Sequence, residues 1–436
     1  MSGEPSDGGR EEAIADGIGP RAAQSLAEVS ALPTSLRAVL DYYATTGEFA
    51  FDVVRLQRRV DAYVEEVIDE AFAPVEQAIA EEAGVDPDAV SFAYDTKLTM
   101  PAELTLGHLY QRASVGSPAG FDPVDRSRRR SPLERVPIVG SATKPDEAAY
   151  ERAREQVAAV ERAEAVTELV VVALLDGDMR DAMNDAEYDD FRVEGAPGVD
   201  RPRTAEIAQR VLRERVEELF EGYPDAVRGA YREAVDRSEA HQDRDPYFRE
   251  LMADAREGDA DALAAIRDEY KHGSFVGPDP DSDGDLDDVA PVADPVIRPA
   301  ELFVGDEPAF PYLKTQYGRV GVIYDGMIEM YRAAGIEIED AFKRSIVFTI
   351  IGAQIWLDDI DDYADDLAEV QLTPVTAEYL LADTEREAYR NVVDATTRYL
   401  DAAERYAAET NSPLAGIGTN YVFRRGDPSV LPGHAD

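Results

Sequence analysis

The sequence predicts an all-α protein. Alanine, glutamate, arginine and leucine dominate the chain, and apolar residues recur at spacings of three and four over long stretches. This periodicity is typical of helices that bury one face. Runs of alternating β-branched residues, which would indicate strands, are nearly absent. The 436 residues are enough for one large domain or two to three smaller ones.

The helical pattern is clearest in residues 53–84, 147–175, 205–220 and 338–368. Proline and glycine interrupt it in two segments, which we expect to be inserted loops, at about 115–146 and 273–311. Residues 1–30 are rich in glycine, aspartate and glutamate, so we expect a disordered acidic N-terminus. The predicted organisation is one helical domain over residues 31–436 that carries both loops.

The chain is extremely acidic, with a formal net charge of −46 at pH 7, and only five of its 44 basic residues are lysine. This composition is typical of proteins that stay soluble in molar salt, where the Debye length falls to about 3 Å. We therefore expect a halophilic protein, with an acidic mesophilic protein as the alternative. The negative field would repel nucleic acid and anionic membrane surfaces, so we expect neither as a partner.

The composition also excludes several kinds of site. The chain has no cysteine, which excludes disulfides, thiolate catalysis and cysteine metal sites. Its longest apolar stretch, residues 346–357, is too short to cross a bilayer. The N-terminal residues are polar and acidic, without the pattern of a signal peptide. We expect a soluble protein of a high-salt cytoplasm, with no integral membrane segment.

An apolar helix runs into a cluster of aspartates in residues 345–369, SIVFTIIGAQIWLDDIDDYADDLAE. On a regular helix Asp358, Asp362 and Asp365 share one face, so they are predicted to continue the buried apolar stripe. Carboxylates rarely extend a core face without compensation. Because Mg²⁺ binds one or two carboxylates together with phosphate oxygens, the DDxxD cluster of Asp358, Asp359 and Asp362 is suited to hold a diphosphate through Mg²⁺. An acidic halophilic surface is the alternative.

A second helix, in residues 165–185, also ends in spaced carboxylates, as AVTELVVVALLDGDMRDAMND. Asp178, Asp181 and Asp185 follow one another at i, i+3 and i+7, which again is one helix face. Two such helices facing each other could hold a metal cluster from both sides. Taken alone, this stretch is more often a helix that ends in a solvated turn.

Together the two stretches resemble the polyprenyl (isoprenyl) diphosphate synthase family, as a divergent haloarchaeal-type member, over about residues 90–400. The family's second motif, DDxxD, is matched by Asp358, Asp359 and Asp362. Its upstream Lys-Thr pair is matched by Lys314 and Thr315. The resemblance implies an isoprenoid-synthase helical bundle, in which two aspartate-rich motifs face each other across a central cavity.

Other motifs of the family are degenerate in this chain. The leading aspartate of the first DDxxD is replaced by Gly177, which leaves Asp176 or Asp185 as substitutes. The RRGxP element is reduced to RVEGAP and keeps Arg192. The element GGKRxRP, which binds the diphosphate of the homoallylic substrate in the family, is matched by DTKLTMP.

This DTKLTMP element keeps Lys97 but has Leu98 and Met100 in place of the family's arginines. Diphosphates are best bound by planar guanidinium groups, so other arginines would have to compensate. The candidates lie in the first loop and near the C-terminus: Arg126, Arg128, Arg129, Arg130, Arg424 and Arg425. Solvated loop charges are the alternative interpretation of both groups.

The resemblance implies a prenyltransferase that uses Mg²⁺ to make a polyprenyl diphosphate from an allylic diphosphate and isopentenyl diphosphate. Lys314 and Thr315 would be its catalytic residues, at the leaving oxygens, while both aspartate motifs hold the metal ions. Two alternatives remain open. A terpene cyclase-like enzyme without a second substrate site is favoured by Leu98 and Met100, and a non-catalytic regulatory or scaffold homologue by Gly177. A homodimer is also left open.

Overall fold

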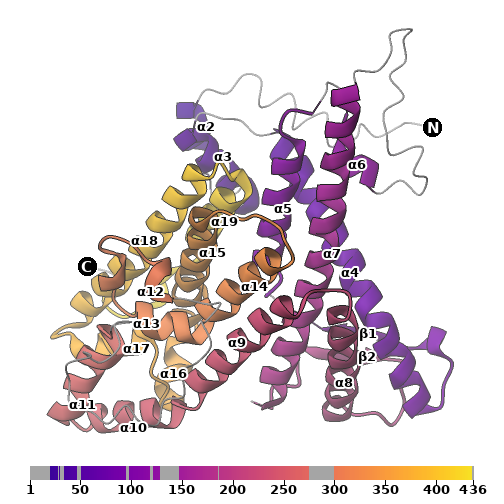
Figure 1. Ribbon diagram of the computed structural model, residues 1–436. Helices are drawn as coiled ribbons and strands as arrows, with labels where there is room; N and C mark the ends of the chain where they lie inside the picture. The colour runs from indigo at the N-terminus through magenta and orange to yellow at the C-terminus, as the bar shows by residue number, and fades with distance from the viewer. Residues whose placement is uncertain are drawn as a thin grey trace, which may run out of the picture. The chain divides into compact units, whose positions relative to one another are not determined.

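Helices dominate the computed structural model, which confirms the predicted all-α class (Figure 1). The structure describes residues 20–27, 29, 34–46, 51–94, 98–117, 121–127, 147–184, 186–273 and 299–434. The chain divides into two compact units. Unit 1 comprises Met1–Phe51, Gly229–Glu329 and Ile338–Asp436, and unit 2 comprises Asp52–Arg228 and Met330–Glu337. Among the described helices, none is long and apolar enough to cross a membrane.

Unit 2 is built around a long central helix, α7 (Glu147–Asn184), which packs against α5 (Met100–Ser114), α6 (Pro123–Ser127) and α8 (Arg201–Phe220). Its remaining long helix is α4 (Phe51–Ala83). The core of α7 is a run of buried apolar residues that includes Leu169, Val170 and Leu175. Asp200 starts α8 because its side chain accepts a hydrogen bond from the amide of Arg203 at 3.0 Å.

Two short strands of unit 2, β1 (Ser91–Tyr94) and β2 (Phe191–Glu194), pair antiparallel with Ala93 opposite Arg192. The single-turn helix η1 (Pro87–Ala89) precedes β1. Gly195, just after β2, has φ +76, and a Cβ there would lie 1.8 Å from the carbonyl oxygen of Ala89. Only glycine allows the chain to leave the strand pair at this point.

Unit 1 is organised around α15 (Asp340–Ala353), which is buried over most of its length and packs against α18 (Glu385–Glu409) and α19 (Pro413–Arg425). Helix α3 (Thr34–Thr46) packs against both α19 and α2 (Pro20–Ala27). Three segments are π-helical: η2 (Ile266–Lys271), η4 (Tyr317–Gly321) and η5 (Gln354–Asp359). Single π turns inside α-helices are frequent at functional sites.

The remaining elements are mostly short helices: α9 (Asp225–Gln242), α10 (Asp245–Arg256), α11 (Ala260–Ala265), α12 (Pro299–Leu302), η3 (Glu307–Ala309), α13 (Leu313–Gln316), α14 (Val322–Ala333), α16 (Tyr363–Glu369), α17 (Pro374–Leu381) and η6 (Pro428–Val430).

The predicted helices are present, with differences in extent. The predicted helices 147–175 and 165–185 form the single helix α7, which ends at Asn184, and α8 begins four residues before the predicted start at residue 205. The predicted helix 338–368 is broken into α15, η5, a turn and α16. Parts of the two predicted loops are helical, since α6 lies in the first and α12 and η3 in the second. Residues 1–19, 128–146 and 274–298 lie outside the described residues.

Candidate functional site

The aspartate cluster of unit 1 lies where α15 passes through η5 into a turn. The amide of Ile360 donates to the carbonyl of Ile355 at 3.2 Å, a bond that spans five residues, as π-helical bonds do. The next bond, from the amide of Asp362 to the carbonyl of Asp358 at 2.9 Å, spans four residues again. One turn of the helix therefore contains an extra residue, which changes the direction in which the following side chains point.

This extra residue overturns the predicted inward stripe. Asp358, Asp362 and Asp365 are exposed, whereas Asp359 is only 1% exposed and Asp366 is half-buried. A regular helix would have turned the first three toward the core. The π turn rotates the chain by about one residue, so the inward positions move to Asp359 and Asp366. Asp358 instead accepts a hydrogen bond from Gln354 on the exposed side.

The buried carboxylate of Asp359 forms an ion pair with Arg319 of η4. Arg319 Nη1 lies 2.8 Å from Asp359 Oδ1, and the arginine side chain is 29% exposed. The other oxygen, Asp359 Oδ2, is buried and has no hydrogen-bond partner. A buried carboxylate oxygen without a protein partner is rare in folded proteins, and catalytic residues are among the exceptions.

Asp366, seven residues further along the chain, also has a carboxylate oxygen without a partner. Its Oδ2 atom is also buried and has no hydrogen-bond partner. Burial raises the pKa of Asp366 to about 7, and the negative charge of Asp359 adds to the rise. Burial likewise raises the pKa of Asp359 to about 6, although the Arg319 guanidinium opposes the shift. Two carboxylates with raised pKa values thus face one arginine, a combination that is enriched at functional sites.

Two aromatic side chains of unit 1 complete the surroundings of Arg319. Tyr270 of η2 is buried and donates to the carbonyl of Leu372 at 2.7 Å. His241 of α9 lies against η4, where a Cβ on Gly318 would come within 2.8 Å of its Nδ1 atom. Burial lowers the pKa of His241 to about 4, with the charge of Arg319 as the next cause. The histidine is therefore neutral near pH 7.

The only tryptophan of the chain, Trp356, fixes η5 in place. Its Nε1–H donates to the carbonyl of Phe423 at 3.0 Å, and its ring stacks on the Phe423 ring with centroids 5.8 Å apart. The backbone of Gly426 approaches the indole so closely that a Cβ there would lie 2.1 Å from Trp356 Cδ1. These contacts with α19 hold the π turn that aims Asp359 inward.

The side chains of this cluster are carboxylates, the ligand type that hard divalent cations prefer. Among the described residues, no three His, Asp or Glu side chains are arranged as a complete metal cage. Mg²⁺ does not need one, because it binds one or two carboxylates and completes its shell with water and phosphate oxygens. The residues that could hold such an ion are Asp359 and Asp366, whose Oδ2 atoms have no hydrogen-bond partner, and the exposed Asp358 and Asp362 of the same segment.

The predicted catalytic pair lies on α13 of the same unit. Lys314 is exposed, while Thr315 is buried and its hydroxyl lies 3.0 Å from the carbonyl oxygens of both Tyr270 and Tyr312. The hydroxyl of Thr315 is therefore used to fasten α13 to η2. Of the two residues, Lys314 is the one whose polar group is presented to solvent.

The residue that begins α13 is conformationally strained. Tyr312 has φ 68, a left-handed conformation that is uncommon for a bulky residue. Its amide donates to the carbonyl of Lys271 at 2.6 Å, and its hydroxyl donates to the buried Glu378 at 2.7 Å. Glu378 also pairs with Lys271 Nζ at 2.7 Å. These contacts hold Tyr312 in the strained conformation at the start of α13.

The first aspartate motif belongs to unit 2. Asp178 and Asp181 of α7 are partly exposed, and Tyr94 of β1 donates a hydrogen bond to Asp178. Asp176, a candidate substitute for the aspartate missing at Gly177, is 3% exposed. It accepts hydrogen bonds from Arg180 at 3.1 Å and Gln209 at 3.0 Å, so both of its oxygens are bonded within the protein.

The predicted diphosphate-binding residues differ in exposure and in whether their charge is already paired. Arg192 is exposed on β2, and Arg425 is exposed on α19. Arg424 pairs with Asp41 of α3, so its charge is already compensated. The remaining predicted residues of the site lie outside the described residues: Lys97, Arg128, Arg129 and Asp185.

Sequence reasoning missed Arg319, Asp366, His241 and Tyr270. The one available signal was the pair of glycines that flank Arg319 in the YGRVG segment, since Gly318 allows His241 to approach. Comparisons with family models, with curated proteins and with solved structures find no match to this chain.

Proposed function

We propose that this chain is an Mg²⁺-dependent prenyltransferase that makes a polyprenyl diphosphate from an allylic diphosphate and isopentenyl diphosphate. The observation that carries the proposal is the pair of buried, unpartnered oxygens of Asp359 and Asp366 beside Arg319. Burying these two carboxylates without a ligand disfavours the folded state, because each must lose its hydration. A cation that brings a diphosphate with it would remove that cost.

The roles of the chain's own groups follow from their chemistry. Asp359 and Asp366 would bind Mg²⁺ on the buried side of the cluster. Asp358 and Asp362 would supply further carboxylate oxygens from the exposed side. Bound Mg²⁺ supplies neutralisation of the negative charge that develops on a departing diphosphate. Arg319 offsets part of the negative charge of the cluster and orients Asp359. Lys314, exposed on α13, donates hydrogen bonds to diphosphate oxygens.

A terpene cyclase-like enzyme is the second candidate. Leu98 and Met100, at the positions of the family's diphosphate-binding arginines, have no side-chain donor for a second diphosphate. A cyclase ionises one allylic diphosphate and has no need for that second site. A third candidate is a non-catalytic homologue. It is favoured by Gly177, which replaces an aspartate of the first motif, and by Asp176, whose carboxylate already bonds Arg180 and Gln209.

Product analysis separates the three candidates. The chain is incubated in molar KCl with Mg²⁺ and allylic diphosphates, with and without isopentenyl diphosphate. Elongated products that require isopentenyl diphosphate support the prenyltransferase. Release of diphosphate from the allylic substrate alone supports the cyclase-like enzyme, and no turnover of either substrate supports the non-catalytic homologue.

Calorimetry tests the metal site without depending on turnover. Pyrophosphate should bind in an Mg²⁺-dependent manner to the wild type. We expect binding to weaken at least about tenfold in Asp359→Asn/Asp366→Asn and in Asp358→Ala/Asp362→Ala, since each pair removes charged ligands. Asp394→Asn is the matched control, because Asp394 is an exposed aspartate on α18 of the same unit. Unchanged binding in both double variants would remove the cluster from the proposal.

A further inference from the structure

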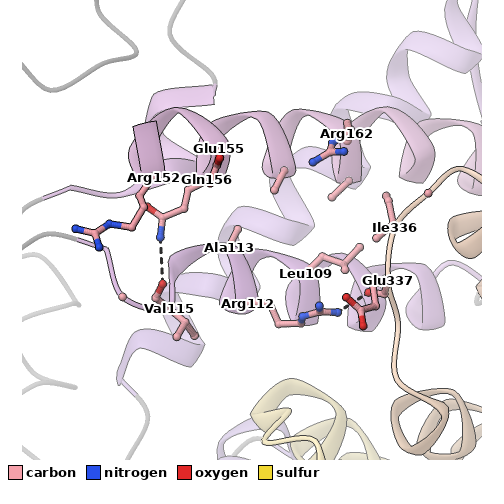
Figure 2. Close-up of a pocket in the computed structure, with 14 residues that line it drawn as sticks. Leu109, Arg112, Ala113, Val115, Arg152, Glu155, Gln156, Arg162, Ile336 and Glu337 are labelled. Atoms are coloured by element: carbon pink, nitrogen blue, oxygen red, sulfur yellow. Dashed lines mark hydrogen bonds between the residues drawn. The ribbon is translucent and has the colours of Figure 1, made fainter. Parts of the chain in front are cut away.

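Unit 2 contains a groove that the proposed function does not use. It runs between the last turns of α5 and the first half of α7, and residues 335–337 close one end (Figure 2). Its volume is about 810 Å³, within the range of small-molecule sites. The α7 side chains that line it lie between Arg152 and Ala163, so the groove is roughly 16 Å long at the helical rise per residue.

The floor of the groove is apolar and made of small residues. Ala113 of α5 and Ala159 and Ala163 of α7 leave the space open, while Leu109 and Ile336 supply larger apolar surface. Figure 2 shows the side chains of the two helices facing each other across this floor. An extended hydrocarbon chain would bury its surface here.

More basic than acidic side chains line the groove, which reverses the balance of the whole chain. Three arginines line it, Arg112, Arg152 and Arg162, against two glutamates, whereas the whole chain has 90 acidic and 44 basic residues. Arg112 donates to the carbonyl of Glu337, and Arg162 Nε donates weakly to its own helix at 3.3 Å. Arg152 is exposed and forms no ion pair with any described carboxylate.

One side chain holds the two walls of the groove in register. Gln156 of α7 donates to the carbonyl of Val115 at 3.1 Å and accepts from the hydroxyl of Ser117 at 3.2 Å. Both polar atoms of its amide are therefore used to tie α7 to the chain that follows α5. The walls of the groove are already ordered without a ligand, so binding would not carry the entropy cost of ordering them.

We propose that this groove binds an amphiphilic anion, a linear alkyl or prenyl chain that ends in a phosphate or carboxylate. The chain lies on the alanine floor, and the anionic group accepts hydrogen bonds from Arg152 at one end of the groove or from Arg162 toward the other (Figure 2). The net charge of −46 would repel a free anion over long distances at low salt. In molar salt the Debye length is about 3 Å, so contact hydrogen bonds and apolar burial remain as the attractive interactions.

The inference does not rest on the proposed function, because no groove residue belongs to the aspartate cluster of unit 1. It is tested by calorimetry on the full chain in molar KCl without Mg²⁺. Three probes separate the contributions: octyl phosphate has the chain and the anion, octanol the chain alone, and inorganic phosphate the anion alone. Octyl phosphate should bind at least about tenfold more tightly than either of the other two.

Variants then assign the binding to the groove. Arg152→Ala/Arg162→Ala should weaken octyl phosphate binding about tenfold or more, because it removes the guanidinium donors at both ends of the groove. Ala159→Phe should also weaken it, by filling the floor. Arg154→Ala is the matched control, since Arg154 is an exposed arginine of the same helix that does not line the groove. It should bind octyl phosphate as the wild type does.

The proposal is overturned if the wild type shows no preference for octyl phosphate over octanol and inorganic phosphate. It is also overturned if the double arginine variant binds as tightly as Arg154→Ala. Both arginines are exposed, so their replacement should leave the helical circular dichroism unchanged.

Discussion

Arg319 compensates the charge of Asp359, a carboxylate that is almost completely buried. Replacing one partner of a buried ion pair costs more than the pair itself contributes, because the other charge is left without compensation. Arg319→Ala should therefore lower the free energy of unfolding by about 3 kcal/mol, the lower end of the usual range, since the arginine keeps 29% of its side chain exposed. Urea denaturation in molar KCl measures this loss.

The double variant Arg319→Ala/Asp359→Asn should recover part of that stability, because it removes the stranded charge as well. Arg203→Ala is the matched control. Arg203 forms exposed ion pairs with Glu82 and Glu206, and such pairs contribute at most about 1 kcal/mol. If Arg319→Ala lowered the free energy of unfolding by no more than Arg203→Ala does, the burial of Asp359 would not depend on Arg319.

Asp366 should make the stability depend on pH. Its pKa rises from an ordinary value of 3.8 to about 7 in the folded state. Between these values the folded protein binds more protons than the unfolded one, so the free energy of unfolding decreases as the pH rises from about 4 to 7. Asp366→Asn removes this contribution, and its stability should decline less than that of the wild type over the same range.

Urea denaturation in molar KCl with a chelator, at pH 5 and pH 8, measures that difference. The chelator removes divalent cations that would otherwise favour the ionised carboxylate. A pH dependence identical in the two proteins would mean that Asp366 titrates with an ordinary pKa.

At the scale of the element, the end of α16 carries avoidable strain. Val370 terminates this helix with φ 61, a conformation usually reserved for glycine. The amides of Val370 and Gln371 both donate to the carbonyl of Asp366, the bonds of a glycine-type helix end. The strained Val370 thus bonds to the backbone of Asp366, whose Oδ2 atom has no hydrogen-bond partner, and backbone strain is common near functional sites.

Val370→Gly should raise the free energy of unfolding by roughly 1 kcal/mol, since the relief of strain exceeds the loss of a partly buried side chain. Thermal denaturation in molar KCl measures the change. Val370→Ala is the comparison, because alanine keeps the strain and loses the packing, so it should destabilise. A destabilised glycine variant would show that packing of Val370 dominates.

The elements also show what sequence reasoning could reach. The helical class and the long helices follow from the spacing of apolar residues, which persists over many turns. The strands β1 and β2 have only four residues each and pair across about a hundred residues, so neither produces a recognisable pattern. The inward aspartates were predicted one residue out of phase, because a π turn changes the helical period without leaving a mark in the sequence.

Partners from distant elements were equally beyond local reasoning. Arg319 pairs with Asp359, which lies forty residues later in the sequence. The hydroxyl of Thr315 donates a hydrogen bond to the backbone of η2. Nothing in the spacing of charged residues predicts which aspartate of LDDIDDYADD receives an arginine. The motif could indicate the kind of chemistry, whereas the identity of the buried carboxylates depended on the tertiary structure.

At the scale of the whole molecule, the net charge of −46 leads us to expect a fold that depends on salt. Mutual repulsion of the carboxylates opposes compaction unless salt screens it. Circular dichroism during dialysis from molar to about 0.1 M KCl should show loss of helix. An unchanged helical spectrum at low salt would contradict the halophilic interpretation. Arg154→Ala, which removes one positive charge, should shift the transition slightly toward higher salt.

Trp356 gives this molecule an optical probe in a useful place. It is the sole indole among 21 tyrosines, and it lies two residues before Asp358 in the π turn that presents the cluster. Its emission therefore reports on one turn of one helix, without labelling or engineering. Titration of Mg²⁺ and pyrophosphate followed by fluorescence can therefore observe the environment of η5 directly in molar KCl.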